Sequence, residues 1–176
     1  MVARRTSGFS LIELMIGLAI AALLMVLALP SYSVWIADAQ IRNAAESIAS
    51  GMRYAQGEAL KRNSQVALVL DPTTGTGGWT AQFVADGSTL QVGTFREGAN
   101  KTTLTAVPAA ARTVTFTGLG QVGTNADGTL PITSVQVLSS TGIAGTRNLN
   151  VMVGNNRTGI KICDPKWPAT DPKGCP

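Results

Sequence analysis

The sequence predicts an α+β fold in which one long N-terminal helix packs on an antiparallel body of about eight short strands. Three observations support this prediction. Residues 9–29 form an apolar run that contains a single charged side chain. Apolar residues then recur every three or four positions as far as residue 59, which is the spacing of one helix face. From residue 65 onward apolar and polar residues alternate, as they do in strands.

The first half of the predicted helix is long enough to cross a membrane. At about 1.5 Å per residue, the run from residue 9 to residue 29 extends roughly 30 Å, the thickness of a bilayer's hydrocarbon core. Its lone charge is Glu13. A charged side chain inside hydrocarbon costs about 3 kcal/mol, so this carboxylate requires a partner. If the chain were cut after Gly8, the positively charged amino group of Phe9 would lie close to it, one helical turn away.

An ordinary secretory signal peptide is the alternative interpretation of this segment. Arg4 and Arg5 would form its basic region, and cleavage would fall near Ala28 or Ser33. The apolar region of such a peptide is typically about 7 to 15 residues long and carries no glutamate near its start. The length of the run and its acidic residue therefore favour a membrane-spanning helix that is retained.

The second half of the predicted helix begins at a pair of aromatic residues and has one apolar face. Tyr32 and Trp35 follow the apolar run, where amphipathic aromatic side chains mark a membrane–water interface. The apolar face is formed by Ile41, Ala45, Ile48, Met52, Ala55 and Ala59. This face needs a surface to pack on, and the rest of the chain must supply it.

Two features adjust the stability of this second half. The pairs Asp38–Arg42 and Glu58–Arg62 have opposite charges four residues apart and are expected to support the helix. Glycines at positions 51 and 57 are expected to weaken it, by about 1 kcal/mol each relative to alanine.

Strands are predicted wherever the apolar period is two. Val66–Leu70 is a short continuous apolar run, which indicates a buried strand. Further alternating segments cover residues 79–83, 90–92, 104–106, 114–116, 135–137, 149–153 and 160–162. Asp71, Asp86 and Asp127 precede proline or glycine directly or nearby and are interpreted as turn residues. Asp86-Gly87, between two such segments, is a strong hairpin signal.

The start of the chain resembles a known processing signal. G-F-S-L-I-E after a short basic leader is similar to the class III signal of type IV pilins and type II secretion pseudopilins. The resemblance implies that a prepilin peptidase cuts between Gly8 and Phe9 and methylates the new amino group of Phe9. It also implies that Glu13 is the family's acidic fifth residue, which acts in subunit assembly, and that Pro30 is the proline that often follows the apolar segment.

The body resembles the minor pilins and minor pseudopilins of the GspH/FimT group, because one long helix is followed by an all-β body. The stretch N-R-T-G-I-K-I-C-D-P looks like the carboxyl ends of FimU- and FimT-type minor pilins. Those members often read G-R-x-R before a cysteine, whereas here Gly159 is followed by Ile160. The resemblance implies a type IV pilin-like fold and a structural role as a minor type IV pilin that helps to initiate or cap pilus assembly, with other minor and major pilins as partners. Two alternatives stay open: a minor pseudopilin of the protein H type in a type II secretion system, and a pilus-associated DNA-binding subunit for natural transformation.

The resemblance divides the chain into four parts. Residues 1–8 are a leader that is removed, 9–30 the transmembrane and assembly half of the helix, 31–63 its amphipathic half, and 64–176 a β-rich body that ends in a disulfide loop. Arg4 and Arg5 are expected to keep the N-terminus in the cytoplasm. The protein is then expected to cross the inner membrane once, with its body in the periplasm, before it enters a pilus or pseudopilus.

Two cysteines, Cys163 and Cys175, are expected to form a disulfide because the periplasm is oxidising. Closing a loop of this size stabilises a fold by about 3 kcal/mol in the chain-entropy model. Two free thiols in a reducing compartment are the alternative. A zinc site is excluded, because two cysteines without any histidine cannot supply four ligands.

The sequence lacks the motifs of common enzymes. It has no histidine, no G-x-S-x-G, no P-loop and no cluster of metal ligands. We therefore predict that the protein is not an enzyme and binds neither a cofactor nor a metal.

The carboxyl end offers a second candidate site, which is basic. Removal of Arg4 and Arg5 with the leader lowers the formal net charge from +4 to +2, so the chain as a whole is not strongly basic. The candidates for phosphate contacts are Arg147, Arg157, Lys161 and Lys166, with Lys173 as a further basic residue nearby. Arg157 and Lys161 have the strand parity opposite to that of the neighbouring isoleucines and are expected to face solvent. The alternative is a solvated basic edge that discourages strand pairing.

Overall fold

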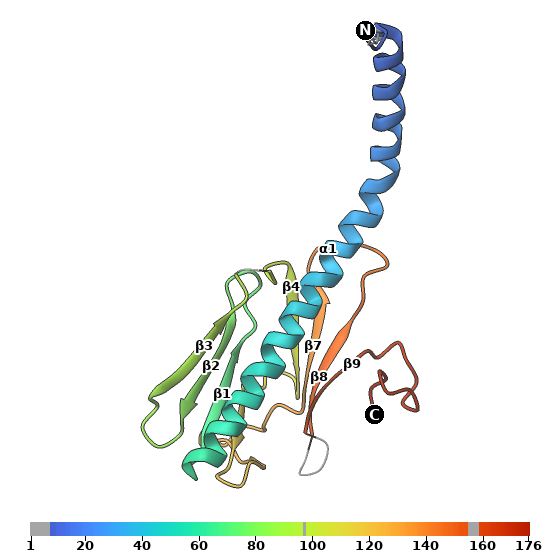
Figure 1. Ribbon diagram of the computed structural model, residues 1–176. Coiled ribbons are helices and arrows are strands. Elements are labelled where there is room, and N and C mark those ends of the chain that lie inside the picture. Colours follow the sequence, from blue (N-terminus) through green and yellow to red (C-terminus); the bar gives the residue numbers. More distant parts are fainter. Residues whose placement is uncertain (1–7, 97, 155–158) are drawn as a thin grey trace, which may run out of the picture.

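The computed structural model describes residues 8–96, 98–154 and 159–176. A single helix, α1 (Leu11–Arg62), precedes nine strands in the described part of the chain (Figure 1). The strands are β1 (Val66–Asp71), β2 (Gly78–Phe83), β3 (Thr89–Thr94), β4 (Thr102–Val107), β5 (Thr113–Phe116), β6 (Val122–Gly123), β7 (Ser134–Ser139), β8 (Leu149–Val153) and β9 (Ile160–Cys163). They form two antiparallel sheets, of order β3-β2-β1-β5-β6 and β4-β7-β8-β9.

The first half of α1 projects away from the body, and its second half lies across both sheets (Figure 1). Residues 8–32 are exposed, although they are the most apolar part of the chain. By length and composition this helix can span a membrane. Pro30 lies inside the helix, where proline removes a backbone hydrogen bond and bends the axis. Figure 1 shows such a change of direction between the projecting half and the body.

The predicted apolar face of the helix is confirmed. Its six residues, from Ile41 to Ala59, have no exposed surface. They pack against apolar side chains that both sheets direct toward the helix, among them Leu68, Phe116, Val135 and Val151. One stripe on the helix therefore closes the hydrophobic core of the entire body.

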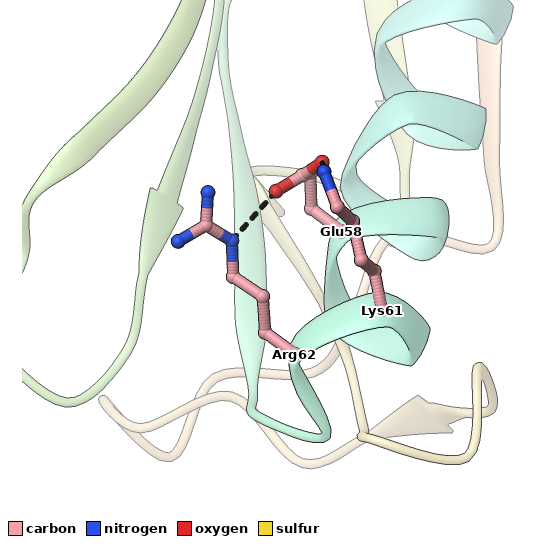
Figure 2. Close-up of polar contacts among 3 residues, drawn as sticks. All are labelled: Glu58, Lys61 and Arg62. Carbon is pink, nitrogen blue, oxygen red and sulfur yellow. Dashed lines mark hydrogen bonds and ion pairs between the residues drawn. The ribbon is translucent and has the colours of Figure 1, made fainter.

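The end of α1 is fixed by local contacts and by one contact to the first sheet. Asn63 adopts the left-handed conformation and caps the helix. The Arg62 guanidinium donates to the Glu58 carboxylate at 2.7 Å, which confirms the predicted pair, and Lys61 lies 3.4 Å from the same carboxylate (Figure 2). Arg62 also lies 5.1 Å from the centroid of the Phe83 ring on β2. This cation–π contact connects the helix end to the sheet.

The other predicted helix pair is wrong. Arg42 pairs with Glu46 at 2.9 Å, whereas the Asp38 carboxylate accepts a hydrogen bond from the backbone N–H of Arg147 at 2.8 Å. The Asp38 carboxylate thus pairs with a backbone N–H in the loop before β8, since a backbone donor outside helices and strands needs another acceptor. The spacing of charges in the sequence could not reveal that the backbone of Arg147 would bind Asp38.

The strand prediction is confirmed with two differences. All eight predicted segments are strands, but they are divided between two sheets, and a ninth strand, β6, lies in the glycine-rich segment after β5. With only two residues, β6 is too short to show an alternating pattern.

The three aspartates interpreted as turn residues form the same kind of turn. Asp71, Asp86 and Asp127 each accept hydrogen bonds from the backbone N–H and the hydroxyl of the residue two positions on. These hydrogen bonds lower the pKa of each carboxyl from its ordinary value. The prediction of turns at these positions is therefore confirmed.

Candidate functional site

The membrane-proximal end of the helix presents one carboxylate on an apolar surface. Glu13 lies in the first turn of α1, and its Oε2 atom is 3.4 Å from the backbone N–H of Ser10, which precedes the helix. The carboxylate borders a shallow groove whose other lining residues are Phe9, Leu14, Gly17, Leu18 and Ala21. Glu13 is therefore available to a positively charged partner that approaches along an apolar helix face.

The predicted cleavage site lies just outside the helix. Gly8 and Phe9 are exposed and precede the first helical residue, Leu11. A bond in this position does not require helix unwinding before a peptidase can reach it. Arg4 and Arg5 lie outside the described residues, so the expected leader and its cytoplasmic placement stay predictions.

The two aromatic residues predicted at the membrane boundary lie together on the exposed part of α1. The Tyr32 and Trp35 rings are stacked, with centroids 6.1 Å apart. Both are exposed, and the first buried helix residue, Ala37, lies two positions after Trp35. The aromatic pair thus separates the projecting half of the helix from the half that packs on the body, as its predicted place at an interface requires.

At the other end of the chain, a disulfide closes a loop over the edge of the second sheet. Cys163 and Cys175 are bonded, which confirms the prediction. Inside this loop the backbone N–H of Asp164 donates to the carbonyl oxygen of Lys173 at 2.8 Å. The Lys161 ammonium donates to the carbonyl oxygen of Gly174 at 3.0 Å. The disulfide and these two hydrogen bonds thus join the end of the loop to β9 and the residue after it.

The structure distributes the candidate basic residues among several contacts. Lys161 is half-buried and its ammonium binds the disulfide loop, so the expectation that it faces solvent holds only in part. Arg147 is held near the helix, with its Nε atom 3.7 Å from Asp38. Lys166 is exposed, and its backbone N–H donates to the Asp164 carboxylate.

Arg157 lies outside the described residues. Lys173 places its ammonium 5.7 Å from the centroid of the exposed Trp167 ring. DNA binding by this end of the chain stays a prediction.

Two contacts that position the body were missed by sequence reasoning. The Arg53 guanidinium donates to the carbonyl oxygen of Ile160 at 3.0 Å, which joins the helix to the outer edge of β9. Trp79 of β2 donates its indole N–H to the Ser47 hydroxyl on the helix at 3.1 Å. Neither contact has a signal in the sequence, since both join residues far apart in the chain.

Comparison with known families gives two matches. Residues 44–157 match the family model of the type II transport protein GspH, and residues 3–29 match the prokaryotic N-terminal methylation motif. The first match covers more than half of the chain and most of the β-rich body. The second covers the apolar half of α1 and the segment that precedes it.

Two solved structures are similar to this chain. The minor pseudopilin EpsH from the type 2 secretion system of Vibrio cholerae has a TM-score of 0.51 at 14% identity, over 74% of this chain and 99% of that one. This likeness concerns the fold. The type IV minor pilin FimU of Pseudomonas aeruginosa has a TM-score of 0.47 at 21% identity, over 77% of this chain and 95% of that one. No curated protein matches the chain significantly.

Proposed function

This chain belongs to the family of the type II transport protein GspH, and from that premise we propose that it is a minor type IV pilin. In this proposal it is a structural subunit that helps to initiate or cap pilus assembly. The observation that carries the proposal is the lone carboxylate of Glu13 on a fully exposed, apolar half-helix.

Glu13 gives the exposed helix a preferred register in an assembly. Burial of its apolar surface against neighbouring helices supplies most of the association free energy, because each Å² of buried apolar surface contributes about 25 cal/mol. The free energy of this apolar burial changes little when one helix is shifted along its neighbour. A buried carboxylate is tolerated only beside a positive charge, so the amino group of Phe9 on a neighbouring subunit would select one register.

Processing and location follow from the methylation motif. A prepilin peptidase would cut between Gly8 and Phe9, in the exposed segment before the helix, and would methylate the amino group of Phe9. The apolar half of α1 would anchor the mature chain in the inner membrane, with the body in the periplasm. Assembly with other pilins would then move the chain from the membrane into the pilus.

A second candidate function is a minor pseudopilin of a type II secretion system. One observation favours it: the family model that matches residues 44–157 is described as the type II transport protein GspH. The fold and the membrane segment would be the same, and only the assembly would differ.

The test is a deletion strain of the native host, scored together for piliation and exoprotein secretion. The proposal expects fewer pili with normal secretion, and the reverse result would establish the pseudopilin. The strain is then complemented with Glu13→Ala or with the isosteric Glu13→Gln. Both variants should insert and be cleaved normally but enter pili about tenfold less, because the partner's amino group loses its counter-charge.

Two further variants separate the charge from other effects. Met25→Leu lies on the same exposed apolar half and conserves its volume, so it should enter pili normally. Gly8→Ala should accumulate as an uncleaved membrane precursor, which shows what a processing defect looks like. If Glu13→Ala is incorporated like the wild type, the proposed register function is wrong.

A further inference from the structure

Strand β3 forms an outer edge of the first sheet and pairs only with β2 (Figure 1). None of its six residues is buried, and Val92 at its centre is 57% exposed. By contrast, β4, at an end of the second sheet, buries two of its six side chains. The β3 edge is therefore the part of the sheets most open to another polypeptide.

The backbone of β3 offers hydrogen-bonding groups on its open side. The backbone N–H of Phe95 donates to Gly77 at 2.9 Å, so the pair Gly77–Phe95 is a hydrogen-bonded pair of the ladder. Because such pairs alternate in antiparallel sheets, Trp79–Gly93 is the next hydrogen-bonded pair, whereas Gly78–Thr94 before it and Thr80–Val92 after it are not hydrogen-bonded. Val92 and Thr94 therefore direct their N–H and C=O groups away from β2. Within the described residues, neither of these backbones has a hydrogen bond on that open side.

The corresponding edge of the second sheet is partly covered by the chain itself. On the outer side of β9, the carbonyl oxygen of Ile160 accepts a hydrogen bond from Arg53, and the backbone N–H of Asp164 donates to Lys173. The disulfide holds the segment that supplies this last acceptor. The same fold thus covers part of the β9 edge with its own residues and leaves the β3 edge available.

The sequence of β3 also lacks the charged residues and prolines that protect many edge strands, and its one register shift with β2 lies away from Val92–Thr94, at Ala81/Gln82. Proteins discourage strand addition with lysine, other charges or proline at sheet edges. Thr89–Thr94 reads T-L-Q-V-G-T and contains none of these. An unprotected edge with free N–H and C=O groups is the surface that β-strand addition requires.

We propose that β3 receives an extended, uncharged strand from a different subunit of the same assembly, which adds antiparallel to the first sheet. This inference rests on the proposed function as a pilus subunit. All strand pairs within the two sheets are antiparallel. Two identical copies paired in this way through β3 would be related by a two-fold axis that reverses the direction of α1, and both membrane segments could not then lie in one membrane in the same orientation. The partner strand would place an aromatic side chain beside Val92, since pairs of aromatic and β-branched residues stabilise neighbouring strands.

Proline at Val92 tests the backbone directly. Val92→Pro deletes an N–H that is not used in pairing with β2, and proline is tolerated on an edge strand whose N–H faces outward. Val92→Thr is the matched control, because it keeps both the N–H and the branched side chain. Val92→Lys adds a charge at the same place and is a second test that leaves the backbone intact.

The full chain is expressed in the deletion strain. We expect normal membrane insertion, leader cleavage and thermal unfolding in detergent for all three variants. Recovery in sheared pili should fall about fivefold to tenfold for the proline variant, which is the loss that one missing hydrogen bond produces. It should also fall for the lysine variant, because a charge on an edge strand discourages strand addition, but not for the threonine variant. Equal recovery of Val92→Pro and Val92→Thr would overturn the proposal.

The partner is identified by a photo-crosslinking amino acid at Thr94, which is exposed at the end of β3. The expected adduct joins this position to a strand of another pilin-family subunit. An adduct with a second copy of this chain, or no adduct in assembled pili, would contradict the inference. A deletion strain with unaltered piliation would instead reject the proposed function. If piliation is restored by Val92→Pro but not by Glu13→Ala, the β3 inference alone is rejected.

Discussion

Trp79 shows how single residues fix the packing of helix on sheet. Its ring lies against Gly51 of α1 on one side and against Gly93 of β3 on another. A Cβ atom built on Gly51 would lie 2.6 Å from the indole, and one on Gly93 would also overlap it. The indole N–H donates to Ser47 on the same helix. Gly51 therefore provides space, which explains a glycine that sequence reasoning treated only as a weakness.

Alanine substitutions at the two helical glycines are expected to have opposite effects. Gly51→Ala gains about 1 kcal/mol in helix propensity but overpacks the indole, which costs about 1–3 kcal/mol, so its free energy of unfolding should fall. Gly57→Ala meets nothing within 4 Å and should gain about 0.5–1 kcal/mol. Chemical unfolding of the full chain in detergent, followed by tryptophan fluorescence, measures both. An equal stabilisation by the two substitutions would show that the indole does not depend on Gly51 for space.

At the scale of elements, the end of α1 joins the first sheet through one shared side chain. Arg62 binds Glu58 within the helix and also contacts the Phe83 ring on β2. The hydrogen bond from Arg62 is the main cause that lowers the pKa of Glu58 from its ordinary value, and the charge of Lys61 lowers this pKa further. Deprotonated Glu58 therefore holds Arg62 in the position from which it reaches the sheet.

The Glu58–Arg62 pair predicts that the stability of the fold falls in acid. The folded pKa of Glu58 is lowered, so its contribution to stability is complete above the ordinary glutamate value of about 4.3 and is lost as the pH falls through the folded pKa. The thermal midpoint should therefore fall in acid. Glu58→Gln and Arg62→Gln should each make this fall less steep, because each removes the interaction with charged Glu58. The thermal midpoints of both variants should still fall in acid to some extent, because the pKa values of Asp71, Asp86 and Asp127 are also lowered.

Thermal scans between pH 7 and pH 3 in detergent measure this difference. Asp86→Asn is a useful comparison, because asparagine can keep the turn but does not titrate. A Glu58→Gln midpoint that runs parallel to the wild type at every pH would contradict the assignment.

The elements themselves could be predicted because their signals are periodic and local. The helix stripe from Ile41 to Ala59 and the alternating strands needed only neighbouring residues. The division into two sheets, the pairing of Asp38 with Arg147 and the contact of Arg53 with Ile160 depend on residues about a hundred positions apart. Such contacts are decided by competition among many partners, which a sequence pattern does not record.

The candidate sites divide in the same way. Glu13 could be found because a charge inside an apolar run is anomalous wherever it occurs. The open edge at Val92 could not, because a strand becomes an edge only through the order of strands in the sheet. The basic residues near the carboxyl end were identified by composition, but composition could not reveal that Lys161 binds the carbonyl of Gly174.

At the scale of the molecule, the protein consists of an exposed apolar half-helix and a body that closes on the other half. Residues 8–32 are exposed throughout, and burial begins near Ala37. The packing that stabilises the body therefore does not involve the segment proposed to lie in the membrane. Changes that loosen the body should leave the membrane anchor in place.

The disulfide provides the test of this independence. Replacing both Cys163 and Cys175 with serine should lower the free energy of unfolding of the body by about 3 kcal/mol, because the crosslink restricts the unfolded chain. It should also free the segment that covers β9, since the contacts of Asp164 and Lys161 with the loop lose their anchor. Lys161→Met, which removes one of these hydrogen bonds and keeps the crosslink, should cost only about 1 kcal/mol. In membranes, the double serine variant should resist alkaline extraction like the wild type, while its body is digested faster by added protease. Release of this variant from the membrane would show that the body helps to hold the anchor. Protease resistance equal to that of the wild type would show that the loop stays on the β9 edge without the crosslink.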